Sequence, residues 1–535
     1  MLVALFFIES LNIFWGFDIK DSGYHMVFYE NIFDAPESVK ELFSTYLTGL
    51  VGGLFLKLFP FLGIVGLRIL HVLLLFLSFT MLYIALRRII SVIHFIIGFS
   101  LVVFSSLTLP SVFYNANLTS FFYVLMSICI YNGLIQKNLL WIVCGGIVCA
   151  LNTFARIPNI LGCSFVLVIF VGGLIKNEKR IQTIRKTLAF FMGFLTGALS
   201  VLLMMMYLGH LDLFLDSMIS LNHTAISSEE VGNTTHSLQN LILVQVKFYF
   251  QLSKIVIVLA ALLFFSRKLE NNRYRYIIGG VVFIWMLVFS YIGVSVYDIL
   301  CALCIIGCCY AIMFKPLEYK TIAALGLLML TLQPCGSDFV HNQGAFSAVV
   351  AAPIASYSLV RKSNVHIIIP VYIVALFIIV CICHFFDRGK IWELNYMFKQ
   401  KELRFIHSSN YKTRIIDETM SEISSYVIQG DTLLVYPCAP MMNYLTHTRP
   451  FKSYLYSSSL IVISGKLKDV SDSFPKVLID KTTSTDWSEV NEFVLNDDRI
   501  DNLDNDGLMT IERFLVKHNY SRVFENSCFV LFVKK

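Results

Sequence analysis

Charged residues are scarce in this chain. Only 15% of its 535 residues are Asp, Glu, Lys or Arg, whereas soluble globular domains average about a quarter. Hydrophobic residues make up 57% of the sequence, its mean hydropathy is +0.71, and it contains repeated apolar runs of about 20 residues, the length that crosses a bilayer as a helix. The composition therefore excludes an ordinary soluble enzyme and predicts a polytopic α-helical membrane protein.

Several catalytic motifs are also missing from the sequence. It has no Walker-type phosphate loop and no HExxH zinc motif, and its C-terminal region has no Gly-x-Ser-x-Gly elbow. These absences argue against nucleotide hydrolysis and against a nucleotide-sugar donor. The net charge of +6 does not indicate nucleic acid, because the basic residues lie in short loops between apolar runs, where they set membrane orientation.

The 13 cysteines lie mostly inside apolar runs, where cysteine behaves as a small apolar residue. Cys438 and Cys528 lie instead in the polar C-terminal region. They pair if that region faces an oxidising compartment and otherwise stay free thiols, and the sequence leaves both alternatives open.

The positions of Lys and Arg predict the topology. Alternate connections between apolar runs carry the basic clusters, for example Arg87 with Arg88, whereas the connections 209–240 and 335–344 contain no Lys or Arg. By the positive-inside rule, the basic connections are cytoplasmic and the N-terminus lies inside. We predict about 13 spans, at residues 1–17, 61–86, 89–109, 112–134, 139–155, 158–175, 187–208, 241–265, 277–295, 297–314, 320–334, 345–360 and 365–385.

This parity requires the short, Gly-rich segment 45–59 to lie at the membrane interface rather than to span. We therefore expect a transmembrane catalytic domain over 1–385, with a first outer loop at 18–60 and a second at 209–240. Residues 386–535 are predicted to form an extracytoplasmic α/β domain, in which strands alternate with helical stretches. Its expected elements are strands at 431–436, 476–480 and 528–533 and a helix at 511–518.

A carboxylate pair, Asp18 and Asp21, directly follows the first apolar run. The low-dielectric membrane edge can raise a carboxylate pKa into the range useful for a general base, and Tyr24 and His25 add a hydroxyl and an imidazole within one turn. The alternative is that the two Asp residues are solvated and cap the helix that follows.

Two arginines lie at the outer ends of predicted spans, where the positive-inside rule does not explain them. Arg156, in Asn152–Pro158, fits a lipid phosphate, because a guanidinium matches phosphate oxygens. A salt bridge to an outer acid, or snorkelling to head groups, is the alternative. Arg68 receives the same interpretation.

The short loop 334–344 places Asp338 and His341 among other polar residues between two apolar runs. This density of polar groups indicates a ligand or a buried network. Two ligands three residues apart are a weak metal signal, so we favour a network, either one that binds substrate hydroxyls or a structural one, and we predict no metal site.

Together these features resemble the GT-C superfamily of polytopic membrane glycosyltransferases. The strongest local similarities are the acidic loop Asp18–His25, the second span with its approach, Phe59–Arg88, and the C-terminal segments Gly430–Pro437 and Met442–Thr446. The resemblance covers most of the chain in topology but rests on weak motifs. Many members carry Asp-Glu in the first loop, whereas this chain has Asp21-Ser22, so the resemblance implies Asp21 as the base and Asp18 as its alternative.

The resemblance implies a polyprenyl-phosphate sugar donor and a lipid, glycan or protein acceptor, with transfer by inversion. Asp21 would take the acceptor proton and Arg156 would neutralise the phosphate leaving group. No cofactor is expected, although some related enzymes use a divalent cation. We expect a bacterial inner membrane location, surrounded by membrane lipids, with a periplasmic active face. The alternatives are a polysaccharide polymerase or ligase, disfavoured because loop 209–240 has no Arg, and a transporter or flippase, disfavoured because the two halves show no duplication.

Overall fold

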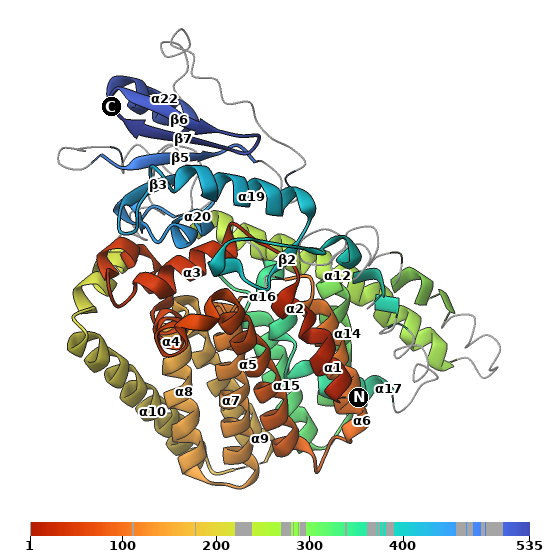
Figure 1. Cartoon of the computed structure of the whole chain (residues 1–535). Helices are drawn as coiled ribbons and strands as arrows, with labels where there is room; N and C mark the ends of the chain where they lie inside the picture. Colours follow the sequence, from red (N-terminus) through yellow and green to blue (C-terminus); the bar gives the residue numbers. More distant parts are fainter. Residues whose placement is uncertain are drawn as a thin grey trace.

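A computed structural model of the chain shows a helical bundle with a small sheet domain at one end (Figure 1). The sheet domain comes from the C-terminal part of the chain, as the sequence predicted. The structure describes residues 2–109, 112–176, 178–219, 238–268, 296–336, 340–360, 390–455, 474–482 and 507–535, together with scattered positions in 280–288, 372–380, 467 and 487.

Within this described part, six helical segments are long and apolar enough to cross a membrane. They match the predicted spans closely, because long apolar runs satisfy their backbone hydrogen bonds as helices. The segments contain α5 (Gly63–Leu86), α7 (Asn115–Ile135), η3 (Ile157–Phe165) with α9 (Val166–Ile175), α10 (Arg180–Tyr207), α12 (Leu238–Lys268) and α14 (Val296–Phe314).

Other predicted spans form shorter helices. The first is interrupted at Ser10, which separates two short helices, and the run 345–360 is divided between two helices as well. The predicted spans 277–295 and 365–385 lie mostly outside the described residues, as does the predicted domain boundary at 385/386. The shorter helices are α1 (Leu2–Glu9), α2 (Leu11–Phe14), α6 (Val92–Ser106), α8 (Leu139–Ala155), α15 (Leu317–Leu332), α16 (Val340–Ser347) and α17 (Ala351–Val360).

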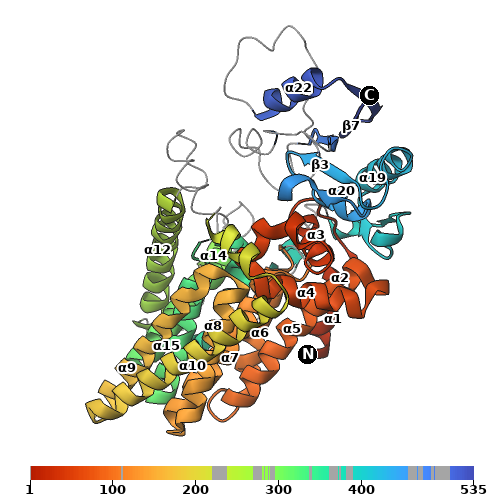
Figure 2. The ribbon, with the colours of Figure 1, turned by 90° about the vertical axis from the view of Figure 1, so that its left-hand side faces the viewer.

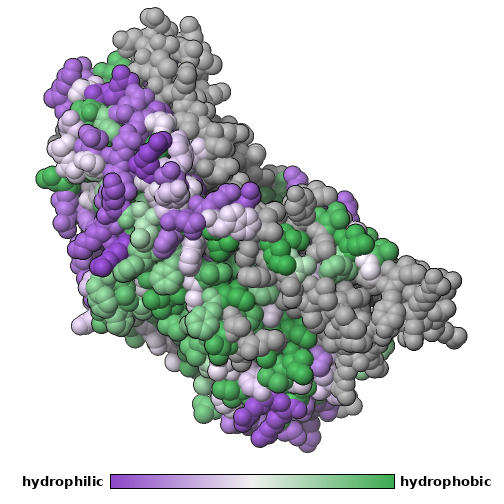
Figure 3. Space-filling view, turned by 45° about the vertical axis from the view of Figure 1, so that its right-hand side comes forward, coloured by the Kyte–Doolittle hydropathy of each residue, from purple (hydrophilic) through white to green (hydrophobic). Residues whose placement is uncertain are grey.

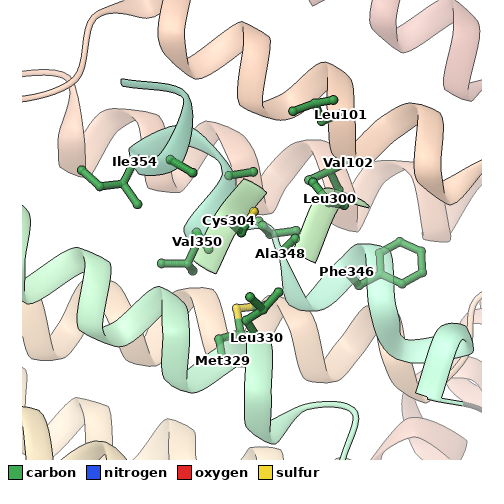
Figure 4. Close-up of a cluster of buried hydrophobic side chains, with 14 of the residues drawn as sticks. Leu101, Val102, Leu300, Cys304, Met329, Leu330, Phe346, Ala348, Val350 and Ile354 are labelled. Atoms are coloured by element: carbon green, nitrogen blue, oxygen red, sulfur yellow. The ribbon is translucent and has the colours of Figure 1, made fainter. Parts of the chain in front are cut away.

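The bundle has an apolar core and an apolar outer surface. Leu300 and Cys304 of α14, Met329 of α15 and Phe346 of α16 meet in one buried cluster (Figure 4). On the outside, apolar side chains cover the bundle between the hydrophilic sheet domain and a second hydrophilic patch at the far end (Figure 3). An apolar belt between two polar ends is the surface that a bilayer requires.

The two ends of the bundle differ in charge, as the sequence predicted. Helix α5 begins at Gly63, which lies beside Tyr444 of the sheet domain, and ends just before Arg87. Near the end of α9, the Nζ of Lys176 donates to the carbonyl of Leu134 at 2.7 Å, next to the basic start of α10. The basic connections therefore lie at the end of the bundle away from the sheet domain.

The segment predicted as the first outer loop, named the first outer segment from here on, covers the end of the bundle opposite to the basic connections. It forms α3 (Asp21–Asn31), η1 (Pro36–Thr45), α4 (Tyr46–Leu58) and η2 (Pro60–Leu62). Helices α3 and α4 run across the bundle axis, whereas α5, α7 and α8 run along it (Figures 1 and 2). Helix α4 has 13 residues, or about 20 Å of length, which is too short to span a bilayer. This arrangement agrees with the interfacial helix predicted for 45–59.

The C-terminal domain contains a five-stranded mixed sheet of order β4-β3-β5-β7-β6. Strands β3 and β5 are parallel, and β7 is antiparallel to both β5 and β6. The predicted strands at 431–436, 476–480 and 528–533 and the helix at 511–518 are confirmed as β3 (Thr432–Tyr436), β5 (Lys476–Asp480), β7 (Phe529–Lys534) and α22 (Gly507–Lys517).

The other elements of this domain are short, apart from one amphipathic helix that packs beside the sheet (Figure 1). A separate two-stranded sheet precedes that helix. These elements are η6 (Ile391–Glu393), β1 (Tyr396–Met397), η7 (Lys401–Leu403), β2 (His407–Ser408), α19 (Asn410–Ile423), α20 (Met441–Leu445), β4 (Arg449–Pro450), η8 (Phe451–Ser453) and β6 (Tyr520–Glu525).

The C-terminal domain is joined to the first outer segment by backbone contacts. The amide of Met441 donates to the carbonyl of Ile19 at 3.1 Å, and the amide of Gly16 donates to the carbonyl of His407 at 2.9 Å. A Cβ on Gly23 of α3 would lie 2.1 Å from the backbone nitrogen of Met441. Only glycine permits this approach, so α3 is held directly beneath α20.

We predict that Gly23→Ala loosens this contact. Alanine favours a helix over glycine by about 1 kcal/mol, but the clash with backbone costs about 1–3 kcal/mol, so the melting temperature of the purified protein should fall. Gly172→Ala in α9, where the added Cβ meets only Leu134 at 3.6 Å, is the matched control and should keep or raise the melting temperature. Equal behaviour of the two variants would contradict the close packing.

Candidate active site

Asp18 binds the start of α3. Its Oδ1 accepts from the amide of Lys20 at 3.0 Å and its Oδ2 from the amide of Ser22 at 2.5 Å. These amides have no acceptor within their own helix, and a carboxylate at this position satisfies them and complements the helix dipole. The capping alternative considered for the acidic pair is thus the geometry observed for Asp18.

Asp21 occupies a different environment from Asp18. It is the first residue of α3, and burial together with the nearby charge of Asp18 raises its pKa to about 7, an effect that Lys20 partly opposes. A carboxyl group with a pKa near 7 exchanges its proton at neutral pH, which is the property a general base requires. Of the two acids, Asp21 therefore has the raised pKa that a general base needs.

Aromatic rings line the face of α3 that carries Asp21. His25, four residues later and on the same face, contacts the rings of Tyr24, Tyr29 and Tyr114 at centroid distances of 5.2, 6.0 and 5.6 Å. Burial lowers the pKa of His25 to about 3 and raises the pKa of Tyr24. Both side chains are therefore neutral at pH 7, and neither supplies a charge.

The C-terminal domain contributes a second buried carboxylate near this site. Asp480 ends β5 and is only 4% exposed. Its Oδ1 accepts from the amide and the hydroxyl of Thr482 at 2.9 and 2.7 Å, whereas its Oδ2 is buried without a hydrogen-bond partner among the described residues. Burial raises its pKa to about 6, and Lys20 lowers it.

Cys438 marks the meeting point of these groups. Lys20, Asp21, Asp18 and Asp480 all act electrostatically on its thiol, and burial raises the thiol pKa. Cys438 follows β3, whose Tyr436 pairs with Ile479 of β5. The carboxyl ends of two parallel strands, a common place for ligand sites in α/β sheets, therefore face the acidic loop. Cys438 and Cys528 are both buried free thiols in this structure.

Arg156 lies in a separate polar compartment at the same end of the bundle. It is buried where α8 meets η3, and its guanidinium donates to the carbonyl of Gln333 at 2.8 Å. Around it, several buried polar atoms have no hydrogen-bond partner among the described residues. They are Tyr123 Oη, Asn152 Nδ2, Asn159 Oδ1 and Gln333 Oε1.

Buried polar atoms of this kind are normally satisfied by water or by a ligand. Asn159 also donates to Oδ1 of Asn152 at 3.0 Å, and Tyr123 lies within electrostatic reach of Arg156. The compartment therefore offers a guanidinium together with amide and hydroxyl groups. This is a chemistry suited to a phosphate and to sugar hydroxyls.

The first turn of α7 lies between the acidic loop that carries Asp21 and the polar compartment around Arg156. On one side, Tyr114 precedes this turn and interacts electrostatically with Asp21. On the other, the side-chain amide of Gln333 donates to the carbonyl of Ala116 at 3.1 Å, and Gln333 accepts from Arg156. The acidic loop and Arg156 therefore both border the start of α7.

Arg68 has a different environment from the one we predicted. It is 1% exposed, and its guanidinium donates to the carbonyls of Asn12, Ile13 and Trp15 at 3.3 Å and of Gly16 at 2.8 Å. Carbonyls at a helix end need such donors. These contacts favour a structural role that closes α2, and a substrate role for Arg68 stays a prediction.

Two predicted site residues lie beyond what the structure describes. Asp338 is outside the described residues, as is the side chain of His341, so their proposed role stays a prediction. In the described part of the chain, no group of three or more His, Cys, Asp and Glu side chains is arranged to hold a metal ion. The expectation that no cofactor is needed stays a prediction.

An apolar pocket of about 320 Å³ lies among α1, α5 and α6. Its lining includes Phe6, Phe76, Phe95 and Phe99 and offers a hydroxyl only from Thr80 and Tyr83. It has no acid, base or cation, so it is not a candidate for the reaction centre.

Sequence reasoning missed Lys20, Asp480 and the amides around Arg156. Asp480 had a visible signal, because it ends a strand that was predicted to be buried. Asn152 and Gln333 had none, because they lie 181 positions apart and only the packing of α8 against α15 through η3 brings them together.

Comparisons with known proteins add one likeness. No family model matches the chain, and no curated protein matches it. Among solved structures, the crystal structure of ArnT from Cupriavidus metallidurans, bound to undecaprenyl phosphate, aligns with 99% of this chain and 96% of that chain, at 10% identity and a TM-score of 0.38. A likeness of this degree supports no conclusion about function by itself.

We predict that Asp21 makes stability depend on pH. Because the folded pKa of about 7 lies above the ordinary value of 3.8, folded protein binds a proton that unfolded protein has lost, and stability falls as pH rises from about 4 to 7. Asp21→Asn should raise the melting temperature at pH 8, on the order of 1–4 kcal/mol of stability, and leave it unchanged at pH 4. A parallel shift at both pH values would contradict the raised pKa.

Proposed function

We propose that this chain is an integral-membrane glycosyltransferase that moves a sugar from a polyprenyl-phosphate donor to an acceptor hydroxyl. The observation that carries the proposal is Asp21, a carboxyl group with a pKa of about 7, held between the end of a membrane bundle and a separate domain. The resemblance of the acidic loop and topology to GT-C enzymes supplies the reaction class. The sugar and the acceptor, whether lipid, glycan or protein, are left to experiment.

Asp21 acts as the general base in this proposal. It takes the proton of the acceptor hydroxyl while the hydroxyl oxygen attacks the anomeric carbon, and the bond to the donor phosphate breaks on the opposite face. One displacement inverts the configuration and needs no glycosyl-enzyme intermediate. Asp18 fixes the start of α3 through two amide hydrogen bonds and so positions the base.

Arg156 acts on the donor in this proposal. A polyprenyl chain keeps the donor in the bilayer, so its phosphate lies where the apolar belt ends. The compartment around Arg156 is at that end of the bundle and contains unsatisfied amide and hydroxyl groups. The guanidinium stabilises negative charge as it develops on the departing phosphate, and the amides bind sugar hydroxyls.

Purified protein in lipid nanodiscs should release polyprenyl phosphate from a labelled polyprenyl-phosphate sugar when an acceptor extract is present. Asp21→Asn should lower kcat by about 100- to 10,000-fold, the usual contribution of a general base, while the protein stays folded. The wild-type rate should fall as pH drops below about 7, because protonation removes the base.

Asp34→Asn is the control for this experiment. Asp34 belongs to the same outer segment but is exposed and pairs with Lys57 at 2.7 Å, so its loss should leave turnover unchanged. Uptake of the sugar lipid into vesicles without cleavage would favour a flippase. Turnover of a polyprenyl-diphosphate-linked sugar supplied in its place, with release of polyprenyl diphosphate, would favour a polymerase. Full activity of folded Asp21→Asn would exclude Asp21 as the base.

A second expected outcome concerns Arg156. Arg156→Lys keeps a positive charge but loses the forked geometry, so the KM for donor should rise by about 10- to 100-fold, the value of a charged hydrogen bond. Free polyprenyl phosphate should inhibit the variant more weakly than the wild type by a similar factor. An effect on melting temperature alone, with donor KM unchanged, would assign Arg156 a structural role.

A further inference from the structure

His447 lies between two carboxylates that come from different parts of the chain. Its Nδ1 is 2.6 Å from Oε1 of Glu30, in the last turn of α3, and its Nε2 is 3.4 Å from Oε1 of Glu402 in η7. His447 itself follows α20 in the C-terminal domain. One imidazole therefore connects the catalytic helix of the first outer segment with two elements of the C-terminal domain.

This geometry depends on protonation. A carboxylate only accepts hydrogen bonds, and a neutral imidazole has one N–H, so it can donate to one of the two acids but not to both. The imidazolium has two N–H groups and satisfies both acids at once. The observed arrangement is therefore complete only when His447 is charged.

The surroundings of His447 contain no competing cation among the described contacts. Oε2 of Glu30 is buried without a hydrogen-bond partner in the described residues, so this acid depends on His447 for compensation. Tyr444 of α20 packs against the imidazole at 6.1 Å, and burial raises its pKa, which keeps it neutral. Lys57, the basic residue near the end of α4, pairs with Asp34 instead.

We propose that His447 is a positioning residue, a pH-dependent clamp that ties α3 to the C-terminal domain as an imidazolium and loses one of its two bonds when it is deprotonated. Helix α3 begins at Asp21 and ends next to Glu30, so the clamp holds the end of the helix opposite to the base. The structural part of this proposal is independent of the proposed transferase activity, and only its effect on turnover rests on that function.

The direction of the pH effect follows from linkage. Hydrogen bonding to Glu30 raises the pKa of His447 above its ordinary value of 6.5, although burial opposes the shift. A raised folded pKa means that the clamp stabilises the folded state fully below the ordinary value. Its contribution disappears as pH rises through the raised pKa of the folded protein.

Hydrogen exchange of the full chain in nanodiscs, without substrate, tests the clamp. The experiment uses the Asp21→Asn background, because Asp21 titrates in the same range. Protection of the α3 amides, corrected for intrinsic exchange rates, should fall by roughly tenfold between pH 6 and pH 9, the loss expected when one hydrogen bond to a charged group is broken. Adding His447→Gln or Glu30→Gln should give low protection at both pH values.

His518→Gln is the matched control, because His518 directly follows α22 of the same domain and contacts Phe474 and Phe514 instead of acids. Adding His518→Gln should leave the pH-dependent protection of the α3 amides the same as in the Asp21→Asn background. Protection of α3 that is independent of pH in the background, or unchanged by His447→Gln, overturns the clamp. If His447→Gln proves too unstable to purify, the clamp is tested by the pH series of the Asp21→Asn background and by adding Glu402→Gln to it. The Glu402→Gln variant should lose only part of the pH-dependent protection of α3.

The effect on turnover is a separate measurement in the Asp21 wild-type protein. His447→Gln should lower kcat and leave the KM for donor unchanged, because Arg156 lies outside the clamp. If the wild type shows no transfer, the proposed function fails while the exchange result still stands. If transfer occurs and α3 exchanges identically in all variants, only the clamp fails.

Discussion

The burial of α3 between two bodies determines the chemistry of this end of the molecule. Helix α3 lies on the membrane bundle and carries the C-terminal domain on its other side (Figure 1). Gly23 allows the backbone of α20 to approach, and the Met441 amide binds the Ile19 carbonyl. Water is thereby removed from Asp21, and desolvation is the largest cause of its raised pKa. The packing of the C-terminal domain on α3 therefore contributes to the raised pKa of Asp21.

The packing of the C-terminal domain on α3 also explains why Asp18 and Asp21 have different roles. Asp18 accepts hydrogen bonds from two backbone amides at the start of α3, whereas Asp21 is the first residue of that helix and lies near Cys438 of the C-terminal domain. These two carboxylates are three residues apart, and their positions in the structure alone make their contact with water different. Similar pairs set acid and base apart in many hydrolases and transferases, because the environment and not the residue type fixes the pKa.

The sequence was sufficient for the architecture but not for the site. The span 139–155 and the strand 476–480 were predicted with the bounds that α8 and β5 have, because uninterrupted apolar runs between polar or turn residues specify such elements locally. The clamp could not be predicted, since Glu30 is 417 residues away from His447 in the sequence and Glu402 is 45 residues away from it. Each is an unremarkable polar residue until the domain docks.

Arg68 and Arg156 show where the limit of sequence reasoning lies. Both are buried arginines near the ends of apolar helices, and both received the same interpretation in the sequence analysis. A buried guanidinium must be compensated. For Arg68, four carbonyls in and just after α2 provide this within the protein. Arg156 is surrounded by amide and hydroxyl groups that are themselves unsatisfied in the described part of the chain.

The difference is therefore one of compensation and not of residue type. A guanidinium that already satisfies a helix end has little capacity left for a ligand. One that lies among unsatisfied polar groups belongs to a compartment that gains energy when a polar ligand or water enters. By this criterion Arg156 suits the donor phosphate of the proposed reaction better than Arg68 does, whereas Arg68 holds the stretch of chain that leads to Asp18.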